Sequence, residues 1–340
     1  MKPRTALHLD SVDDYLGPSA TRFFGSGFRK VGYSWRSKPV DLAIGLGAVR
    51  ATASVDYPED WSRKVEETQL RPHLSTIDAL ILGVRAAELS LARGGVLVAH
   101  DGLAWLRRVD IKAGLAPVED ELDEFCVEAA ITRTQSILGS PGMSVSTVQG
   151  AVAAMTVHCE VQHGGANSTS AVETPALALV DRPGGNNAWW YGDGYRHRRQ
   201  TVREVLVDAT GDHAEAVVTV DPGVEKPVEV ARRGRIDTAP VAAVSMLDSF
   251  VTSLQLGQVL LYEADRVPRA ESNTLWMRNT TIWTDSPHRR AVGSFPASVT
   301  LVDSRRIVAR GETWRTATIF GACRGVQTRC AVAHRIPPGK

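Results

Sequence analysis

The sequence contains two near copies of one short motif, and this repetition constrains the fold more than any other feature. FFGSGFRKV, residues 23–31, and WYGDGYRHR, residues 190–198, share the pattern aromatic, aromatic, Gly, any residue, Gly, aromatic, Arg. A nucleotide-binding GxGxxG loop does not explain the first copy, because no third glycine follows Gly27 at the required spacing. A chance match at one chosen site has a probability of roughly one in ten million. The two motifs therefore indicate a duplication with an offset of 167 residues.

Two further pairs of segments repeat in the same order at nearly the same offset. HLSTIDALILGVRAAELSL, residues 73–91, aligns with AVSMLDSFVTSLQLGQVLL, residues 243–261. LAWLRRVDI, residues 103–111, aligns with TLWMRNTTI, residues 274–282. We therefore predict two tandem copies of one module, joined by a linker rich in Gly, Asn, Ser and Pro. The predicted boundaries are 14–165 for the first module, 166–188 for the linker and 189–338 for the second module.

Each copy contains one segment with the apolar periodicity of a helix. In the first copy Ile77, Leu80, Ile81 and Val84 follow at helical spacing, and Leu82 extends the apolar surface to the other side, which predicts a buried helix. The flanking segments alternate polar and apolar residues or are rich in β-branched residues, as antiparallel strands are. This α+β pattern resembles a tandem double hot-dog fold, in which each antiparallel sheet wraps around one long buried helix. A β-sandwich would lack the helix, and a doubly wound sheet would need several helices.

Composition predicts a folded cytoplasmic protein. The 340 residues are 43% apolar, which is sufficient for a large core, and 39 Lys and Arg residues against 38 Asp and Glu residues disfavour a nucleic-acid role. Neither a signal peptide nor about 18 uninterrupted apolar residues occurs, so no membrane contact is expected. Four scattered cysteines without CxxC spacing predict reduced core thiols. No GxSxG, P-loop or HExxH motif occurs, and we predict neither a metal nor a cofactor.

Two aspartates at the start of the predicted helices are the first candidates for catalysis. Asp78 aligns with Asp248, and the hot-dog resemblance implies a substrate tunnel at the seam between the modules, with an acidic residue near the start of one helix. A structural alternative stays open, because Ser75-x-x-Asp78 and Ser245-x-x-Asp248 have the form of a capping box.

Histidines and other polar residues complete the candidate set. His73 precedes the first helix and His197 ends the second aromatic-glycine motif, and each is a candidate general base with a surface or capping role as the alternative. A metal site at His158 and Cys159 is disfavoured, since strand alternation sends neighbouring side chains to opposite faces. The predicted substrate-binding residues are Arg85, Glu88, Thr252 and Gln255 on the two helices, with Arg29 and Arg196 in the repeated motifs.

These candidates have structural alternatives as well. Polar side chains among aliphatic ones, such as Arg85 and Gln255, need a partner if they are buried. Glu88 lies three residues from Arg85, where an ordinary ion pair would explain both residues. Arg29 and Arg196 suit either a structural role or binding of an acyl-carrier phosphate or a substrate oxygen.

Three segments together resemble the avirulence protein D family, first associated with plant-pathogenic pseudomonads. They are SVDDYLGPSATRFFGSGFRKVGYSW at 11–35, LSTIDALILGVRAAELSL at 74–91 and YGDGYRHRR at 191–199. Members of that family direct synthesis of syringolide-type elicitors. The resemblance implies condensation of a β-ketoacyl thioester, carried by coenzyme A or acyl carrier protein, with a pentulose or other hydroxyketone. Acyl transfer, aldol closure and dehydration would then give a butenolide or syringolide-like product.

Two other functions remain open at this point, and a homodimer is possible under each. One is a dehydratase or cyclase of a polyketide-type substrate, although no HxxxGxxxxP motif occurs and Thr252 stands where those enzymes usually carry Gln or His. The other is a non-catalytic module that binds a lipid or an autoregulator.

Overall fold

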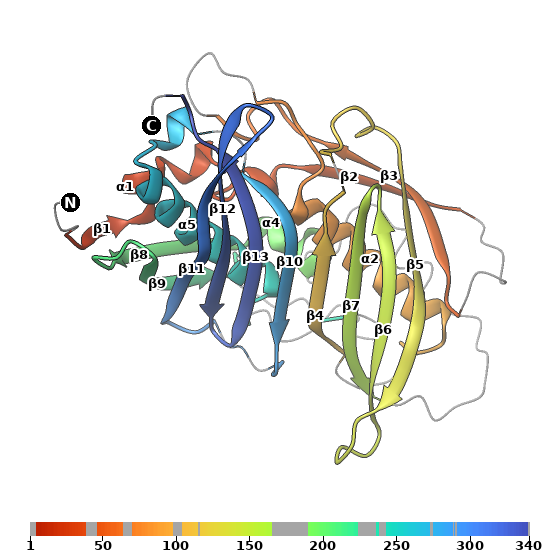
Figure 1. The fold of residues 1–340 in the computed structure, drawn as a ribbon. Helices are drawn as coiled ribbons and strands as arrows, with labels where there is room; N and C mark the ends of the chain where they lie inside the picture. Colours follow the sequence, from red (N-terminus) through yellow and green to blue (C-terminus); the bar gives the residue numbers. More distant parts are fainter. Residues whose placement is uncertain are drawn as a thin grey trace.

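Thirteen strands of the computed structural model form one antiparallel sheet, and two long helices lie on one side of it (Figure 1). The structure describes residues 5–38, 46–63, 70–97, 104–114, 116–164, 190–223, 236–237, 243–272, 275–287, 289 and 291–338. The first half comprises β2 (Gly32–Lys38), β3 (Val49–Asp56), α2 (Thr76–Arg93), β4 (Trp105–Lys112), β5 (Phe125–Ser136), β6 (Met143–Val152) and β7 (Met155–Gly164). The second comprises β8 (Arg199–Val207), β9 (His213–Asp221), α5 (Met246–Asp265), β10 (Trp276–Thr284), β11 (Ser294–Ala309), β12 (Glu312–Cys323) and β13 (Val326–Arg335).

The two halves of the sheet repeat one strand order. From the centre outward the first half runs β4-β7-β6-β5-β3-β2, and the second runs β10-β13-β12-β11-β9-β8. The halves join where β10 pairs with β4, from Asn279 opposite Lys112 to Trp283 opposite Arg108. Two tandem copies of one module would give this arrangement. The predicted linker at 166–188 lies outside the described residues, so the module boundaries stay a prediction.

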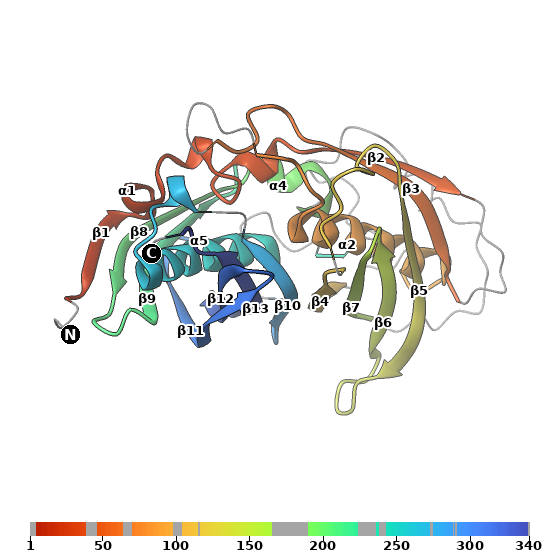
Figure 2. The same cartoon turned by 45° about the horizontal axis from the view of Figure 1, so that its top comes forward.

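Each long helix is covered by the strands of its own half. The helix α2 contacts β3–β7, and α5 contacts β8–β13. Figure 2 shows the strands of each half curving around their helix. Contact is close, because a Cβ added at Gly83 would lie 2.6 Å from Val157 Cγ1, and one added at Gly257 would lie 2.6 Å from Ile319 Cδ1. Both helices are buried on nearly every side, as the all-round apolar pattern predicted.

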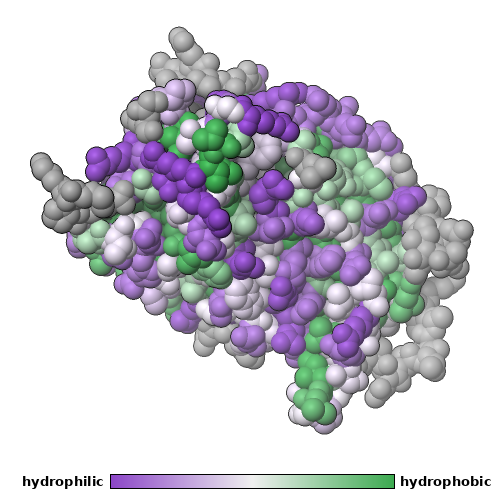
Figure 3. Space-filling view, in the orientation of Figure 1, coloured by the Kyte–Doolittle hydropathy of each residue, from purple (hydrophilic) through white to green (hydrophobic). Residues whose placement is uncertain are grey.

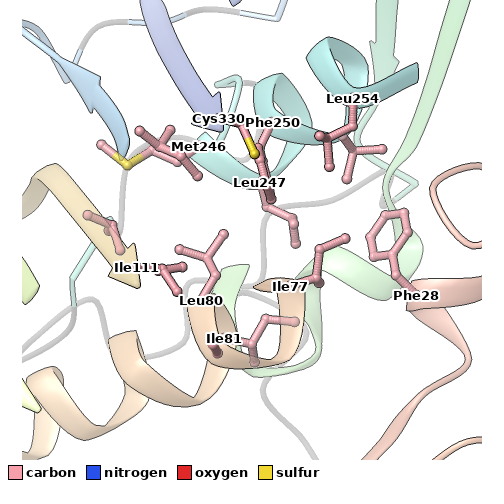
Figure 4. Packing of buried hydrophobic residues seen from close by; sticks show 14 of the residues in the cluster. Phe28, Ile77, Leu80, Ile81, Ile111, Met246, Leu247, Phe250, Leu254 and Cys330 are labelled. Carbon is pink, nitrogen blue, oxygen red and sulfur yellow. The ribbon is translucent and has the colours of Figure 1, made fainter. Parts of the chain in front are cut away.

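One hydrophobic core extends across both halves. Near the start of each helix, Ile77 and Leu80 of α2 lie opposite Leu247 and Phe250 of α5, with Phe28 close by (Figure 4). All five side chains are buried. Because this core is continuous, the seam between the halves is part of the folded interior and not a loose domain contact.

The two aromatic-glycine motifs pack against each other. Phe28 stacks on Tyr195 with ring centroids 6.2 Å apart, and the Arg196 guanidinium donates to the carbonyl oxygens of Arg29 and Val31 at 2.6 Å each. A Cβ added at Gly27 would lie 1.8 Å from the Trp61 carbonyl oxygen, which only glycine avoids. The glycine thus allows a tight backbone passage beside the stacked aromatic rings.

The N-terminal segment packs on the second half of the sheet. It comprises β1 (Leu7–Ser11), α1 (Val12–Leu16) and the short helices Ser19–Thr21 and Gly27–Arg29. Here β1 pairs with β8, the Tyr15 hydroxyl donates to Glu263 Oε1 at 2.6 Å, and Arg22 Nη1 donates to Gln255 Oε1 at 2.8 Å. A segment placed mostly in the first module by its sequence position is therefore built onto α5 and β8.

Several local expectations need correction. The strands β8 and β9 form a hairpin, because Gly211 at φ 78° allows a turn between them. The strand β2 was not expected, because polar and apolar residues alternate over only a few of its positions. Cys159, Cys323 and Cys330 are buried, whereas Cys126 is exposed on the outer side of β5. Among the described residues, none of the helices combines the length and the hydropathy of a membrane-spanning segment.

Candidate functional site

Two pockets meet at the start of α2. The first, here called the aromatic pocket, has a volume of about 70 Å³ and is lined by Phe23, Tyr57, Trp61, Gln258, Tyr262 and Arg269. The second, here called the seam pocket, has a volume of about 150 Å³ and is lined by Thr76, Ala116, Pro117, Met155, Trp276 and Arg278. Residues shared by both linings are His73, Ser75, Leu275 and Met277. The pockets therefore adjoin each other around the residue that caps α2.

A capping box shapes this end of the helix. Ser75 Oγ accepts from the Asp78 amide at 3.2 Å, and the Ser75 amide donates to Asp78 Oδ2 at 2.6 Å. The amides of the first turn have no acceptor within the helix and carry the positive end of its dipole. Since Ser75 and Thr76 line the seam pocket, this positive end faces the space where a ligand would lie.

Asp78 does not line either pocket, but it accepts a hydrogen bond from a tyrosine that does. The Tyr33 hydroxyl donates to Asp78 Oδ1 at 2.6 Å, and the Tyr57 hydroxyl donates to Asp78 Oδ2. Burial raises the pKa of Asp78, although hydrogen bonds from both tyrosines and from Ser75 oppose the increase. Burial and the nearby Asp78 raise the pKa of Tyr57 well above its ordinary value. Tyr57 also lines the aromatic pocket and bonds to the His73 carbonyl oxygen at 2.8 Å, so it connects the carboxyl to the ligand space.

Asp248, the equivalent residue in the second half, has different partners. The Arg198 guanidinium donates to both carboxylate oxygens at 2.6–3.1 Å, and Gln200 Nε2 donates at 2.5 Å. Burial acts to raise the pKa of Asp248, but the charge and hydrogen bonds of Arg198 outweigh it and lower the pKa. Asp248 and Arg198 are each 1% exposed, and neither lines the two pockets. Asp248 is thus an ionised cap held by a buried ion pair.

Two substitutions between the copies account for this difference. At the offset of 167 residues, Tyr33 corresponds to Gln200 and Val31 to Arg198. Tyr33 and Gln200 both bond the aspartate of their own half. Arg198 adds a cation where the first copy has an apolar side chain. The two helix ends therefore share a cap but differ in charge.

Among the predicted catalytic residues, His73 alone lines the two pockets. It is half-buried, and its Nδ1 lies 3.5 Å from the Arg71 carbonyl oxygen. His197 lies exposed at the end of α4 (Tyr195–His197), outside both linings. Asp78 contacts pocket residues without lining a pocket itself, as described above.

The predicted substrate-binding residues have structural contacts instead. Glu88 accepts from the Ile236 amide at 2.9 Å, and the Thr252 hydroxyl donates to the Asp248 carbonyl oxygen at 2.9 Å. Gln255 accepts from Arg22, and Arg85 is half-buried on α2, where burial lowers its pKa. None of these, nor Arg29 and Arg196, lines either pocket. Arg29 donates to the Gly25 carbonyl oxygen at 2.8 Å and to Gln200, and Arg196 bonds the backbone of the first motif.

Sequence reasoning missed several pocket residues. Gln258, three residues beyond the predicted Gln255, donates to the Tyr262 hydroxyl at 3.2 Å in the aromatic pocket. Arg269 lies in a short helix after α5 and donates to the Thr21 carbonyl oxygen at 3.2 Å. Tyr57 follows β3 directly. A helix that is apolar on every side has no distinct polar face, so its sequence does not show which side borders a pocket. Of the missed residues, only Tyr57 carried a sequence signal, because it is a polar aromatic residue at a strand end.

The fold and the pockets define a class of protein: a repeated antiparallel α+β sheet with two adjoining pockets at one helix N-terminus. The chain belongs to the AvrD family, described as Pseudomonas avirulence D protein, whose family model matches residues 7–337. This agrees with the resemblance found in the sequence. No curated protein matches the sequence significantly.

Solved structures resemble the chain over most of its length. An acyl-ACP thioesterase from Bacteroides thetaiotaomicron is 9% identical, with 90% of this chain and 99% of that chain covered and a TM-score of 0.39. The tesB protein of Mycobacterium avium subsp. paratuberculosis is 10% identical, with coverages of 88% and 96% and a TM-score of 0.34. A hot-dog-fold protein of unknown function from Alicyclobacillus acidocaldarius is 9% identical, with coverages of 86% and 94% and a TM-score of 0.35. Because these scores are low, we infer no reaction from these neighbours.

Proposed function

We propose that this AvrD-family protein processes an acyl thioester at the start of α2, condensing a β-ketoacyl thioester with a hydroxyketone such as a pentulose. The observation that carries the proposal is the convergence of both pockets on the Ser75 cap, with His73 and Tyr57 in the lining. A helix N-terminus offers amide donors where negative charge develops on a thioester carbonyl oxygen. Family membership supports this substrate class. The product would be a butenolide or syringolide-like compound.

The first step is acyl transfer to a hydroxyl of the co-substrate. The hydroxyl oxygen attacks the thioester carbon, and the first-turn amides of α2 stabilise the oxyanion. His73 takes the hydroxyl proton and returns it to the departing thiolate as the C–S bond breaks. Among the residues that the structure describes, no other histidine lines the pockets, so His73 is the base that this lining provides.

The second step closes the ring. The carbon between the two carbonyl groups loses a proton to His73, and the resulting enolate attacks the ketone of the co-substrate. Tyr57 donates its proton to the new alkoxide. The Tyr57 phenolate then takes the second proton of the same carbon as the C–OH bond breaks, and the departing hydroxide takes the proton held by His73, which gives water, the ring double bond and both side chains in their starting states. Asp78 acts as a positioning residue, because it accepts the Tyr57 hydrogen bond and fixes the phenol at the pocket.

The proposed catalytic groups thus lie in the first half, the second half contributes part of the pocket lining, and the Asp248 helix end has a structural role. We further propose that the halves are two hot-dog modules, at 14–165 and 189–338, each built around its helix. Since acyl thioesters of fatty-acid metabolism are cytoplasmic, the proposed reaction occurs in the cytoplasm.

Incubation with a β-ketoacyl thioester and a pentulose, followed by mass spectrometry, tests the proposal. Release of thiol together with an acyl ester or its cyclised product is expected. Tyr57→Phe and His73→Ala are expected to reduce the rate by about 100-fold or more. His197→Ala is the matched control, because that exposed histidine lies outside the pockets.

Two results would contradict the proposal. Loss of water from a β-hydroxyacyl thioester, without acyl transfer, would indicate a dehydratase. Binding of the thioester without turnover would indicate a non-catalytic lipid-binding module.

A further inference from the structure

A groove crosses the outer face of the second half, on the side of the sheet away from α5. This outer groove has a volume of about 880 Å³, and its lining includes Trp276, Arg278, Arg305, Arg310, Trp314 and Thr316. Figure 3 views this side of the sheet and shows hydrophilic residues interleaved with paler and hydrophobic ones. A cavity of this size is typical of sites for cofactor-sized ligands.

The strand register explains why this face is hollow. Trp276, Ala333, Thr316 and Arg305 are paired in turn across β10, β13, β12 and β11, so they lie in one row on one face. The two middle residues are small, whereas the outer two are long. Trp276 and Trp314 lie edge to face with centroids 6.2 Å apart. Small residues therefore form the floor, and tryptophan and arginine side chains form the walls.

The outer groove is positively charged, and most of its arginines form no ion pair with described residues. Arg278, Arg305 and Arg310 have no ion pair with any residue that the structure describes. Of the two carboxylates among the described lining residues, Glu312 pairs with Arg335, and Asp303 then faces three lining guanidinium groups. An anionic ligand fits this surface better than a neutral one.

Neighbouring arginines on the opposite face serve a different purpose. Arg306 Nη2 lies 2.9 Å from Asp265 Oδ1, and Arg315 Nε lies 3.0 Å from Asp265 Oδ2. Asp265 is at the negative end of the α5 dipole, where an uncompensated carboxylate would be unfavourable. The inward arginines are thus required by the fold, whereas the outward Arg305 has no such structural partner.

The outer groove adjoins the seam pocket. Ala116, Pro117, Trp276 and Arg278 belong to both linings. The seam pocket in turn shares His73 and Ser75 with the aromatic pocket. A continuous series of lining residues therefore leads from the positive outer groove to the start of α2.

We propose that the outer groove binds the adenine nucleotide end of a coenzyme A thioester. Arginines bind the phosphates, a tryptophan packs on the adenine, and the pantetheine chain passes Pro117 and Trp276 into the seam pocket. The inference rests on the proposed function, and it selects coenzyme A as the carrier. A carrier protein presents its phosphate on a convex surface and offers no aromatic base for the tryptophan walls.

Direct binding of adenosine 3′,5′-bisphosphate to the full chain, measured by calorimetry, tests the groove independently of turnover. The double variant Arg305→Ala/Arg310→Ala is expected to weaken binding by about tenfold or more, since hydrogen bonds between charged groups are lost. Arg133→Ala is the matched control, because Arg133 is an exposed arginine on β5 of the first half. Equal binding to wild type and double variant would overturn the proposal.

Turnover separates this inference from the proposed function. The ratio of kcat/KM for a β-ketoacyl coenzyme A thioester to that for the same N-acetylcysteamine thioester is expected to fall about tenfold in the double variant and not in the control. Processing of an acyl carrier protein thioester but not the coenzyme A thioester would overturn the groove assignment. If the nucleotide binds as expected while no thioester reacts, the groove stands and the proposed function is wrong.

Discussion

Replacing Asp248 by Asn is predicted to destabilise the fold more than replacing Asp78 by Asn, although the two aspartates occupy equivalent positions. Arg198 is 1% exposed and directs its guanidinium at the Asp248 carboxylate and the Ala243 carbonyl oxygen. Asp248→Asn leaves this buried cation without its counter-charge, at a cost of about 3 kcal/mol or more. Asp78→Asn keeps one acceptor oxygen for one tyrosine, and the other tyrosine hydroxyl can turn to accept from the new NH2 group, so the expected loss is about 1 kcal/mol, the size of a cap.

The pH dependence of the two variants should differ in sign. Folding lowers the pKa of Asp248. The contribution of Asp248 to the free energy of unfolding is therefore present above the ordinary aspartate pKa of about 4, and it is lost as pH falls through the lower folded value. The pKa of Asp78 is raised by folding, so its contribution is full below about 4 and is lost as pH rises through the folded value.

Urea unfolding followed by circular dichroism at several pH values measures both effects. The stability difference between wild type and Asp78→Asn should decrease from pH 4 toward neutrality. The difference for Asp248→Asn should stay constant over that range and shrink only in stronger acid. If the two variants unfold at the same urea concentration with the same pH profile, the assignment of one ionised and one raised-pKa carboxyl is wrong.

Three further predictions follow from local geometry. Tyr57→Phe should slow thioester turnover by about 100-fold, whereas Tyr33→Phe, outside both pockets, should have a much smaller effect on the rate. Gly27→Ala should lower the free energy of unfolding by several kcal/mol, because the added Cβ would clash with the Trp61 backbone. Gly164→Ala is the control, since a Cβ there meets open space and should cost about 1 kcal/mol or less. Urea unfolding measures both losses. Asp265→Asn should destabilise the protein near neutral pH by about 1–3 kcal/mol, and the difference from wild type should shrink in acid, since arginines and His334 outweigh burial and lower the pKa of Asp265.

The repeat made much of the fold predictable, because equivalent segments in both copies had to satisfy one pattern. The buried helices were visible from periodicity alone, and the structure places them at Thr76–Arg93 and Met246–Asp265. Packing of the N-terminal segment on α5 was not predictable, since Arg22 and Gln255 lie 233 residues apart and no local pattern links them. Contacts of that kind are set by tertiary packing, which short-range sequence signals do not encode.

The candidate site was predictable only in part for a related reason. Both aspartates could be read as caps or as catalysts, and the capping geometry is present in both. Their difference lies in partners outside the helices, Tyr33 on β2 in one copy and Arg198, directly before β8, in the other. The same offset that revealed the repeat also aligns Val31 with Arg198, so this comparison, extended position by position, would have marked the first helix end as the one without a cation.

The unlike partners of the two caps have a consequence for how such a protein evolves. In a homodimer of single modules, one gene supplies both helix ends, so a mutation that places a cation at one end places it at the other as well. Once both modules are encoded in a single chain, position 198 can acquire arginine while position 31 stays valine. The Asp248 end can then serve stability alone. Selection for a new substrate can act on the Asp78 end without loss of the fold.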